Sequence, residues 1–244
     1  MLPKRLYVMS MCPLLLAISG CNGSPPSGES SGAGGTPAAT APVALTVPAG
    51  EYKLDPTHAI LQWSISHMGV SNYHARIKTL DATLNLDPAN IEKSTIKLVV
   101  KADSVDTGYA ADYKKTHPNT GFDTWDAELG RSDKFLDGAK NPEITFVSTK
   151  VEKIGDGTGK VTGDLTFRGI TKPVTLDVKF IGQQARHFML GVPVVGFEAE
   201  GTIVRVDFGM MRDALGPTAK IYFNGEFLGP KPGGAASVPT PASQ

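Results

Sequence analysis

The feature that most limits the fold of this chain is a regular alternation of apolar and polar residues between Val161 and Phe180. Period-two alternation predicts β-strands with one face toward water and one face toward the interior. Gly169 and Pro173 bracket the single interruption, because Gly tolerates unusual φ values and Pro cannot continue a ladder of hydrogen bonds. The stretch therefore predicts an antiparallel hairpin, whose dry face must be covered by a second sheet, by a helix, or by the same sheet closed into a barrel.

Residues 1–21 have the character of a targeting segment and are set aside from the fold. Lys4 and Arg5 give a basic start, and the apolar run Leu6–Ile18 is too short to span a membrane. The run ends in ISGC (residues 18–21), which resembles a bacterial lipobox. That resemblance implies cleavage before Cys21 and lipid on its sulfur, and the alternative is an ordinary signal peptide with a chance cysteine.

The position and number of the cysteines lead to two further predictions. Asn22 after the lipidated Cys21 resembles an outer-membrane sorting signal, which implies the periplasmic face of the bacterial envelope. Cys12 is removed with the signal, and no cysteine follows Cys21. The mature domain therefore has no internal disulfide, thiol nucleophile or zinc–cysteine site.

Composition divides the remainder of the chain into three parts. Residues 22–48 are dominated by Gly, Ser, Pro, Ala and Thr, with Glu29 as the only charge, and predict a disordered tether. Residues 229–244 predict a second disordered tail, which leaves 50–228 as one domain. Without residues 1–21 the acidic side chains outnumber the basic ones by two, and no basic stripe stands out, so no nucleic-acid partner is expected.

The domain is rich in strand patterns and poor in helix. Asp55-Pro56, Asp87-Pro88 and residues 155–160 predict turns between strands. The single helical candidate is Asp123–Leu136, where Asp123 or Thr124 caps the helix and the inward residues are Trp125, Leu129, Phe135 and Leu136. Eight or nine antiparallel strands with so little helix predict an all-β sandwich or barrel, which the pattern alone does not separate. Besides the hairpin, the strand-like runs are Ala59–Ser66, Ala75–Leu86, Thr95–Lys101, Glu143–Glu152, Val194–Val206 and Ala219–Phe227.

Several short motifs together resemble the YceI-like family. They are PEITF (142–146), GDLT (163–166) with GITKP (169–173), and Arg205 followed by DFG (207–209). The resemblance runs from Tyr52 to Phe227. It implies an antiparallel lipocalin-like β-barrel with one short helix, and a polyisoprenoid-binding protein of the bacterial envelope.

One region departs from the family pattern. Residues 125–137, WDAELGRSDKFLD, lack the histidine that the family often carries in this segment, and an apparent insertion, Tyr109–Phe122, precedes them. We therefore expect the mouth of the barrel to be reshaped here.

In a barrel of this kind the dry face lines an interior that is wide enough for one small ligand. For the apolar candidates the alternative is ordinary core, and in a small barrel both interpretations hold, because an apolar pocket is a core with space left in it. The candidate ligand-binding residues are Trp63, Ile65, Phe146, Leu165, Phe167, Leu176, Phe180, Phe197 and Arg205.

In a strand, Arg205 falls on the same face as Phe197 and Ile203, so the alternation predicts that its side chain points inward. A guanidinium in the interior must be paired. The structural interpretation is an ion pair with Asp207 or Asp213, and the functional one is a clamp for a polar lipid head group, since the guanidinium fork suits phosphate or a ring carbonyl.

The other charged candidates are expected to be less informative. Arg168 and Lys172 at the tip of the hairpin are expected to be solvated, with contact to a head group as the alternative. His67 follows Leu61, Trp63 and Ile65 on the apolar face of its predicted strand and is the last residue of that series. It is either an ordinary end-of-strand residue or a polar group at one end of a pocket. The spacing of His58, His67 and His74 matches no metal signature, so no metal is expected.

These observations favour a lipid-anchored envelope protein that binds or carries an isoprenoid lipid, a polyprenyl chain or a prenyl quinone, in the barrel lumen. We expect no catalytic residue and no cofactor other than such a bound lipid. Two alternatives stay open. One is an enzyme that acts on such a lipid, which a perturbed histidine–carboxylate pair inside a cleft would support. The other is an interaction module whose lumen is filled by its own side chains.

Overall fold

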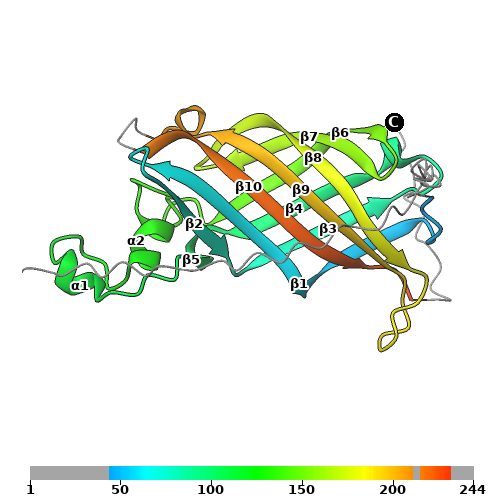
Figure 1. Cartoon of the computed structure of the whole chain (residues 1–244), viewed down its shortest axis with the longest axis horizontal. Helices are drawn as coiled ribbons and strands as arrows, with labels where there is room; N and C mark the ends of the chain where they lie inside the picture. Colours follow the sequence, from blue (N-terminus) through cyan, green and yellow to red (C-terminus); the bar gives the residue numbers. More distant parts are fainter. Residues whose placement is uncertain (1–43, 211–214, 232–244) are drawn as a thin grey trace, which may run out of the picture. The chain divides into compact units, whose positions relative to one another are not determined.

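A computed structural model describes residues 44–210 and 215–231. Within these residues ten strands form one antiparallel sheet, in the order β10-β9-β8-β7-β6-β4-β3-β1-β2-β5. β10 also pairs with β1, and this closes the sheet into an eight-stranded barrel (Figure 1). The strands are β1 Gly50–His67, β2 Ser71–Ile77, β3 Leu80–Leu86, β4 Thr95–Lys101, β5 Val105–Asp106, β6 Glu143–Gly155, β7 Thr158–Phe167, β8 Ile170–Gln184, β9 Val194–Val204 and β10 Leu215–Leu228.

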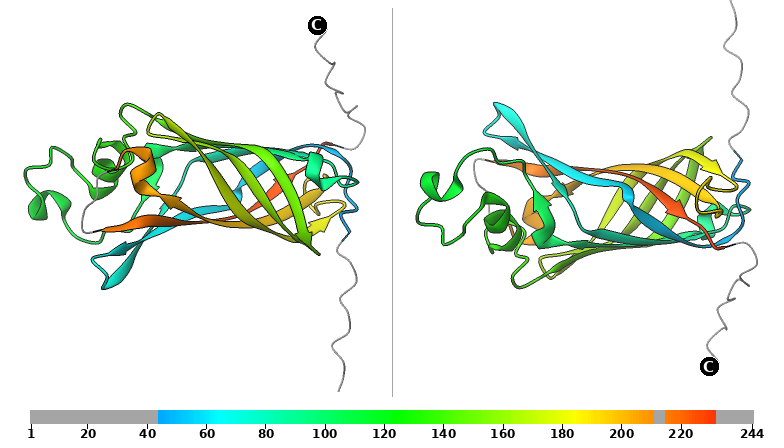
Figure 2. Two further views of the ribbon diagram at one scale, coloured as in Figure 1. Left: turned by 90° about the horizontal axis from the view of Figure 1, so that it is seen from above. Right: turned by 90° about the horizontal axis from the view of Figure 1, so that it is seen from below.

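The two ends of the barrel are built differently (Figure 2). At the helical end lie α1 (Tyr113–Thr116), α2 (Trp125–Arg131) and the 3₁₀ turn η3 (Arg205–Phe208). The opposite end, here the loop end, carries the β6–β7 turn and the β8–β9 loop. The remaining 3₁₀ turns are η1 (Ile91–Lys93) and η2 (Ala102–Ser104). Across the described ranges, no helix is long and apolar enough to cross a membrane.

The predicted hairpin is confirmed as β7 and β8. Its turn is only two residues long, since Phe167 pairs with Ile170. Arg168 and Gly169 both have positive φ, 54° and 73°, as the tight turns that match strand twist require. The break therefore does not extend to Pro173, which lies inside β8. β8 pairs with β9 only from Leu176 onward. At Pro173 the edge of β8 that faces β9 therefore has no partner strand, and the missing N–H of the proline breaks no hydrogen bond there.

Two other stretches differ from the expected strands. Asp55-Pro56 does not form a turn between strands but lies within β1. The pairing of β1 with β10 shifts register between Leu54 and Ala59, and this bulge accommodates a proline that has no N–H to donate. The run expected over 75–86 is divided between β2 and β3 at residues 78–79.

The predicted helix is present but shorter than expected. Thr124 caps it, accepting a hydrogen bond from the Ala127 N–H at 3.0 Å, and α2 ends at Arg131 instead of continuing to Leu136. Beyond Ser132 the chain forms turns, in which the Leu136 N–H donates back to the carbonyl of Leu129. The four predicted inward residues all pack in the core: Trp125, Leu129, Phe135 and Leu136.

The ordered domain starts earlier than the composition predicts. The last five residues of the expected tether, 44–48, lie against the barrel, and Val47 is buried. The side chain of Gln183 accepts a hydrogen bond from the Thr46 N–H and donates one to the carbonyl of Ala44. The Tyr52 hydroxyl donates to the carbonyl of Pro48 at 2.7 Å, and burial raises the pKa of Tyr52 to about 12.

Two sets of sequence-based predictions fall outside the described residues. Residues 1–43 contain the expected targeting segment, Cys21 and most of the expected tether. Residues 232–244 contain most of the expected tail. The signal, the lipidation site and the tail therefore stay predictions.

Candidate functional site

The lumen of the barrel contains a cavity of about 640 Å³ toward the loop end. Its walls come from apolar positions of the barrel strands, including Phe180, Phe197 and Phe223. At its outer rim lie Leu45, the segment around η1 and the β6–β7 turn, so the cavity reaches the loop end. We call this space the first cavity.

A second cavity, of about 530 Å³, lies toward the helical end. Aromatic residues form much of its wall, among them Trp63, Tyr113 and Trp125. Arg205, His67 and His117 also line it, whereas the charged residues of the first cavity lie at its rim, in η1 and beside the β6–β7 turn. Both volumes fall within the range of about 300–1,000 Å³ that is common for small-molecule sites.

The two cavities meet in the middle of the barrel. The same five apolar side chains line both of them, so these side chains form a waist between the two cavities. The waist residues are Leu61, Leu98, Phe146, Leu176 and Ile221. An extended apolar molecule that passed the waist would contact both cavities.

All nine predicted lumen residues lie on this lining. Phe180 and Phe197 face the first cavity. Phe146 and Leu176 belong to the waist. The other five face the second cavity: Trp63, Ile65, Leu165, Phe167 and Arg205. Their inward orientation follows the predicted parity, whereas their contact with a ligand stays a prediction.

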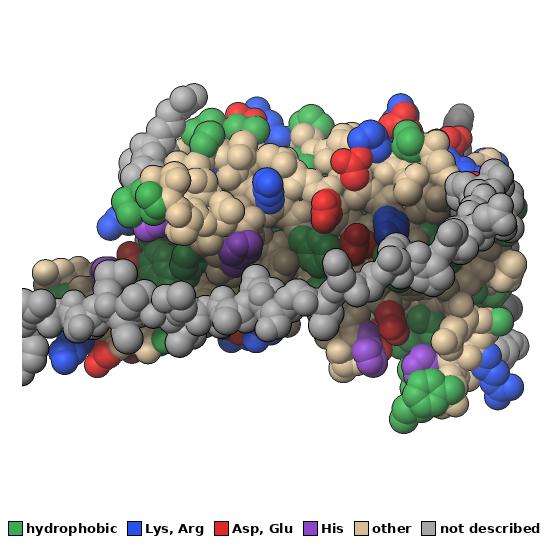
Figure 3. Space-filling model, in the orientation of Figure 1, with side chains coloured by type: hydrophobic (Ala, Val, Ile, Leu, Met, Phe, Trp, Pro, Cys, Tyr) green, Lys and Arg blue, Asp and Glu red, His purple; other side chains and the backbone are tan. Residues whose placement is uncertain are grey.

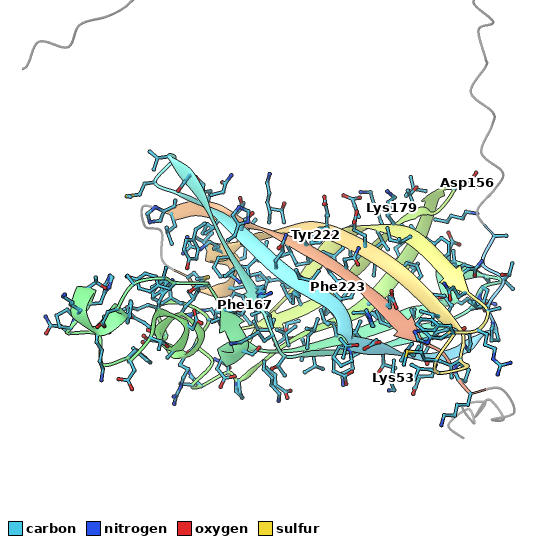
Figure 4. All side chains as sticks on the ribbon, turned by 60° about the horizontal axis from the view of Figure 1, so that its bottom comes forward. Lys53, Asp156, Phe167, Lys179, Tyr222 and Phe223 are labelled. Carbon is cyan, nitrogen blue, oxygen red and sulfur yellow. The ribbon has the colours of Figure 1, made fainter. Side chains whose placement is uncertain are left out.

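Several lining residues were not among the sequence-based candidates. On β10, Phe223 lines the first cavity, while its neighbour Tyr222 donates a hydrogen bond to Glu198 at 2.9 Å (Figure 4). The alternation that identified the other lumen residues is also present in β10, so the sequence pattern could have identified Phe223 as well. Tyr109, Tyr113 and His117 come from the insertion, where no alternation exists to mark them.

The segment Tyr109–Phe122, which we expect to be an insertion, forms one wall of the second cavity. Tyr113 stacks on His117, with ring centroids 4.6 Å apart, and lies 5.8 Å from the ring of Trp125. Its hydroxyl donates a hydrogen bond to the buried carboxylate of Glu128. Burial, and then this hydrogen bond, raise the pKa of Tyr113 to about 12. The Trp125 indole N–H donates to the hydroxyl of Tyr73 at 2.7 Å.

The indole nitrogen of Trp63 is the exception among these polar groups. Its Nε1 is buried and has no hydrogen-bond partner among the described residues. A buried N–H without a partner is costly, on the order of 1–3 kcal/mol.

Arg205 is buried as predicted, with 5% of its surface exposed, but it does not continue a strand. β9 ends at Val204, and Arg205 begins η3. Its Nη1 donates a hydrogen bond to the carbonyl of Gly216 at 3.1 Å. Of the two predicted carboxylate partners, Asp213 lies outside the described residues, and no ion pair between Arg205 and Asp207 occurs within them.

Arg168 is not solvated at the hairpin tip, contrary to the prediction. Its guanidinium donates to three backbone carbonyls, those of Phe208 at 3.1 Å, Asp133 at 2.7 Å and Phe135 at 2.6 Å. These contacts join the β7–β8 turn to η3 and to the chain that follows α2. Lys172, in contrast, is exposed as predicted.

The histidines do not assemble a site in the lumen. His58 pairs with Asp55 (Nδ1 to Oδ2, 2.9 Å), but neither residue lines either cavity. The hydrogen bond from the Thr57 hydroxyl, and then that from His58, lower the pKa of Asp55 to about 2. The same Asp55 carboxylate raises the pKa of His58. Over 44–210 and 215–231, no three His, Cys, Asp or Glu side chains gather as metal ligands would.

An eight-stranded antiparallel barrel around an apolar lumen defines this chain as a lipocalin-like protein. Residues 52–227 match the YceI-like domain family, and the chain belongs to that family. The comparisons thus confirm both the predicted family and the predicted antiparallel barrel.

Three relatives show the extent of the likeness. Protein YceI of Escherichia coli is 38% identical over 174 residues, which cover 70% of this chain and 82% of that protein. The crystal structure of the Campylobacter jejuni YCEI protein is 26% identical, with a TM-score of 0.54, over 66% of this chain and 88% of the other. A polyisoprenoid binding domain from Saccharophagus degradans shares the fold at 14% identity, with a TM-score of 0.51, over 75% and 100% of the two chains.

Proposed function

We propose that this protein binds or carries an isoprenoid lipid, a polyprenyl chain or a prenyl quinone, in the lumen of its barrel. The observation that carries the proposal is the pair of apolar cavities that adjoin at the waist. A long unbranched or methyl-branched tail suits a lumen that is narrow, apolar and extended along the barrel. A lumen filled by its own side chains would not contain cavities of this size.

The polar groups of the second cavity favour this cavity for the head group. Arg205 contributes a buried guanidinium to its wall, and His67 and His117 line it as well. The guanidinium is a donor, so it suits an acceptor such as a quinone carbonyl or a phosphate oxygen. The tail would then extend past Phe146 toward the loop end.

The relatives add support of a different kind. A protein with the same fold is described as a polyisoprenoid binding domain, although the low identity shows only the shared architecture. We further propose that Cys21 carries lipid and holds the protein at the periplasmic face of the envelope, in the outer membrane. The support for this part is the lipobox-like ISGC sequence at residues 18–21.

A binding role, without catalysis, fits the placement of the titratable groups. Asp55 and His58, the histidine–carboxylate pair whose pKa values are shifted, line neither cavity. In the second cavity, His117 stacks on Tyr113, and Glu128 accepts the hydrogen bond of that tyrosine. These groups build a wall and do not form a nucleophile with an adjacent base.

Tail length tests the proposal. Prenyl quinones and prenyl phosphates of increasing length are titrated into the purified full chain. Large ligands realise roughly 0.3 kcal/mol per heavy atom after the costs of association. About 20 buried carbons therefore give a dissociation constant of tens of micromolar, and about 40 give one near a nanomolar. Affinity that does not change with length, or no binding at all, contradicts the proposal.

A pair of matched variants locates the ligand. Leu165→Asp places a carboxylate in the second cavity and should abolish binding, because a charge in an apolar lumen is strongly unfavourable. Val147→Asp, on the outer face of β6, should leave binding unchanged. Circular dichroism must show that both variants are folded. Equal loss of binding in both contradicts a site in the lumen.

A further inference from the structure

The β8–β9 loop exposes three consecutive large apolar side chains. Phe188 is 86% exposed, Met189 75% and Leu190 52%. Single exposed apolar residues are ordinary on protein surfaces, but a run of three is unfavourable unless it has a partner. We call these three residues the apolar loop. Figure 3 shows hydrophobic side chains gathered on the projection that this loop forms below the barrel.

Backbone contacts hold the apolar loop outward. The Gly191 N–H donates to the carbonyl of His187 at 2.8 Å, and the His187 N–H donates to the carbonyl of Val192 at 2.6 Å. The Nδ1 of His187 accepts from the N–H groups of Met189 and Leu190, each at 3.2 Å. The exposure of the apolar side chains is thus a property of a hydrogen-bonded turn.

The apolar loop lies at the end of the barrel where the first cavity opens. Gln183, at the start of this connection, hydrogen-bonds to Ala44 and Thr46, and Ala44 lines the rim of the first cavity. Two further exposed apolar residues lie at the same end, Ile181 on β8 and Ile154 next to the β6–β7 turn.

The charge of this connection is of one sign. Between β8 and β9, residues 185–193 contain one formal charge, that of Arg186, while Lys179 on β8 lies opposite Glu198 on β9. Arg186 lies beside the apolar loop, with its Nε 3.6 Å from where a side chain at Gly191 would begin. Apolar side chains flanked by cationic ones are typical of segments that enter the interface of an anionic bilayer.

We propose that the apolar loop inserts into the surface of an anionic lipid bilayer and places the rim of the first cavity against the membrane. The inserted residues are Phe188, Met189 and Leu190, and Arg186 lies at head-group depth. An apolar ligand then passes between bilayer and lumen with little exposure to water. This docking goes beyond the proposed lipid binding and does not depend on which molecule fills the lumen.

Fluorescence quenching by brominated lipids tests the orientation. Phe188→Trp is prepared in the full chain, together with Val70→Trp as the matched control. Val70 is 79% exposed, and it lies in the β1–β2 turn at the helical end. The native Trp63 and Trp125 give the same background in both variants. The probe is a vesicle of phosphatidylethanolamine and phosphatidylglycerol with bromine on the acyl chains.

We expect the added fluorescence of Phe188→Trp to shift to the blue and to be quenched, and that of Val70→Trp to be unaffected. Equal quenching of both variants, quenching of neither, or quenching of Val70→Trp alone overturns the proposal. Because bromine on acyl chains quenches only inserted groups, a lipid at Cys21 that merely holds the protein near the vesicle does not produce this difference.

A second measurement separates docking from the lumen ligand. Phe188→Ser combined with Met189→Ser should reduce vesicle binding of the full chain about tenfold or slow ligand transfer from vesicles by the same factor. Its affinity for a detergent-solubilised isoprenoid should not change. Unchanged vesicle binding together with an unchanged transfer rate overturns docking. A failure to bind isoprenoid in any variant would instead contradict the proposed function.

Discussion

The ring of Phe146 lies where a side chain at position 163 would be. A Cβ placed on Gly163 would approach the Phe146 Cζ to 2.5 Å and the carbonyl oxygen of Val147 to 2.6 Å. Cβ contacts below 3.0 Å are essentially never seen in proteins. The glycine on β7 therefore leaves the space in which the waist residue on β6 adopts its position between the two cavities.

Gly163→Ala should consequently lower the free energy of unfolding by roughly 1–3 kcal/mol, as overpacking does in a filled interior. It should also weaken binding of long tails, because Phe146 must move into the lumen. Gly182→Ala is the matched control, since a Cβ there meets nothing within 4 Å. Denaturant unfolding and ligand titration check both variants. Similar losses in the two would show that glycine itself, and not the contact with Phe146, is responsible.

Arg168→Asn should loosen the helical end of the barrel. The guanidinium donates to three carbonyls, and hydrogen bonds of a charged donor contribute about 1.5–3 kcal/mol each when buried. Since the side chain is partly exposed, we expect a total loss of about 2 kcal/mol in denaturant unfolding. Asn tolerates the positive φ of this position, so the change reports on the guanidinium. Lys172→Gln, at an exposed site, should stay within about 0.5 kcal/mol of the parent protein.

Arg205→Ala should destabilise the fold by about 3 kcal/mol, because the guanidinium is buried and its removal leaves its partners unsatisfied. Thermal melting and retention of a prenyl quinone are measured on the same sample. A variant that melts normally but loses the ligand would make Arg205 a head-group clamp. Arg205→Lys keeps the charge, and it should recover part of the stability but not the geometry of the fork.

The unfolding free energy should fall in acid because of Asp55. The pKa of this carboxyl is about 2 in the folded protein, below its ordinary value near 3.8. A depressed carboxyl pKa stabilises the fold above the ordinary pKa, and this contribution is lost as the pH falls from about 4 through 2. It amounts to about 2 kcal/mol near neutral pH. Asp55→Asn should remove this acid dependence, and Thr57→Val should reduce it. If the unfolding free energy of Asp55→Asn falls in acid as much as that of the parent protein, Asp55 is not the cause of the acid dependence.

Cys21→Ala should release the protein from the membrane after a carbonate wash, or trap its precursor. Two or three acyl chains, at about 0.8 kcal/mol for each buried methylene, hold far more firmly than a surface loop. Cys12→Ala, a change within the expected targeting segment, is the control and should fractionate with the parent protein. Firm membrane retention of a correctly cleaved Cys21→Ala protein would contradict lipidation at this residue.

The inward face of each strand was predictable because successive side chains in a strand point to opposite sides whatever surrounds them. Leu165 and Phe167 on β7, and Phe180 on β8, therefore face the lumen as their parity requires. The cap at Thr124 was predictable for a similar reason, since the hydroxyl satisfies an N–H of its own helix.

The environment of Arg168 was not predictable in this way. Its partners, the carbonyls of Asp133, Phe135 and Phe208, lie 33 to 40 residues away in the sequence. The wall built by Tyr113 was hidden for the same reason, because its stacking on Trp125 depends on how the insertion folds back.

By itself, the sequence determined the strands, their wet and dry faces, the family and the apolar character of the lumen, because each depends on short-range pattern or on motifs. Only the tertiary structure decided that β1 and β10 pair to close a barrel and that the lumen is left unfilled with a waist at Phe146. It also decided that the apolar loop lies at the open end of the first cavity. These properties depend on contacts between segments that are distant in sequence, and on how closely their side chains fill the space between them.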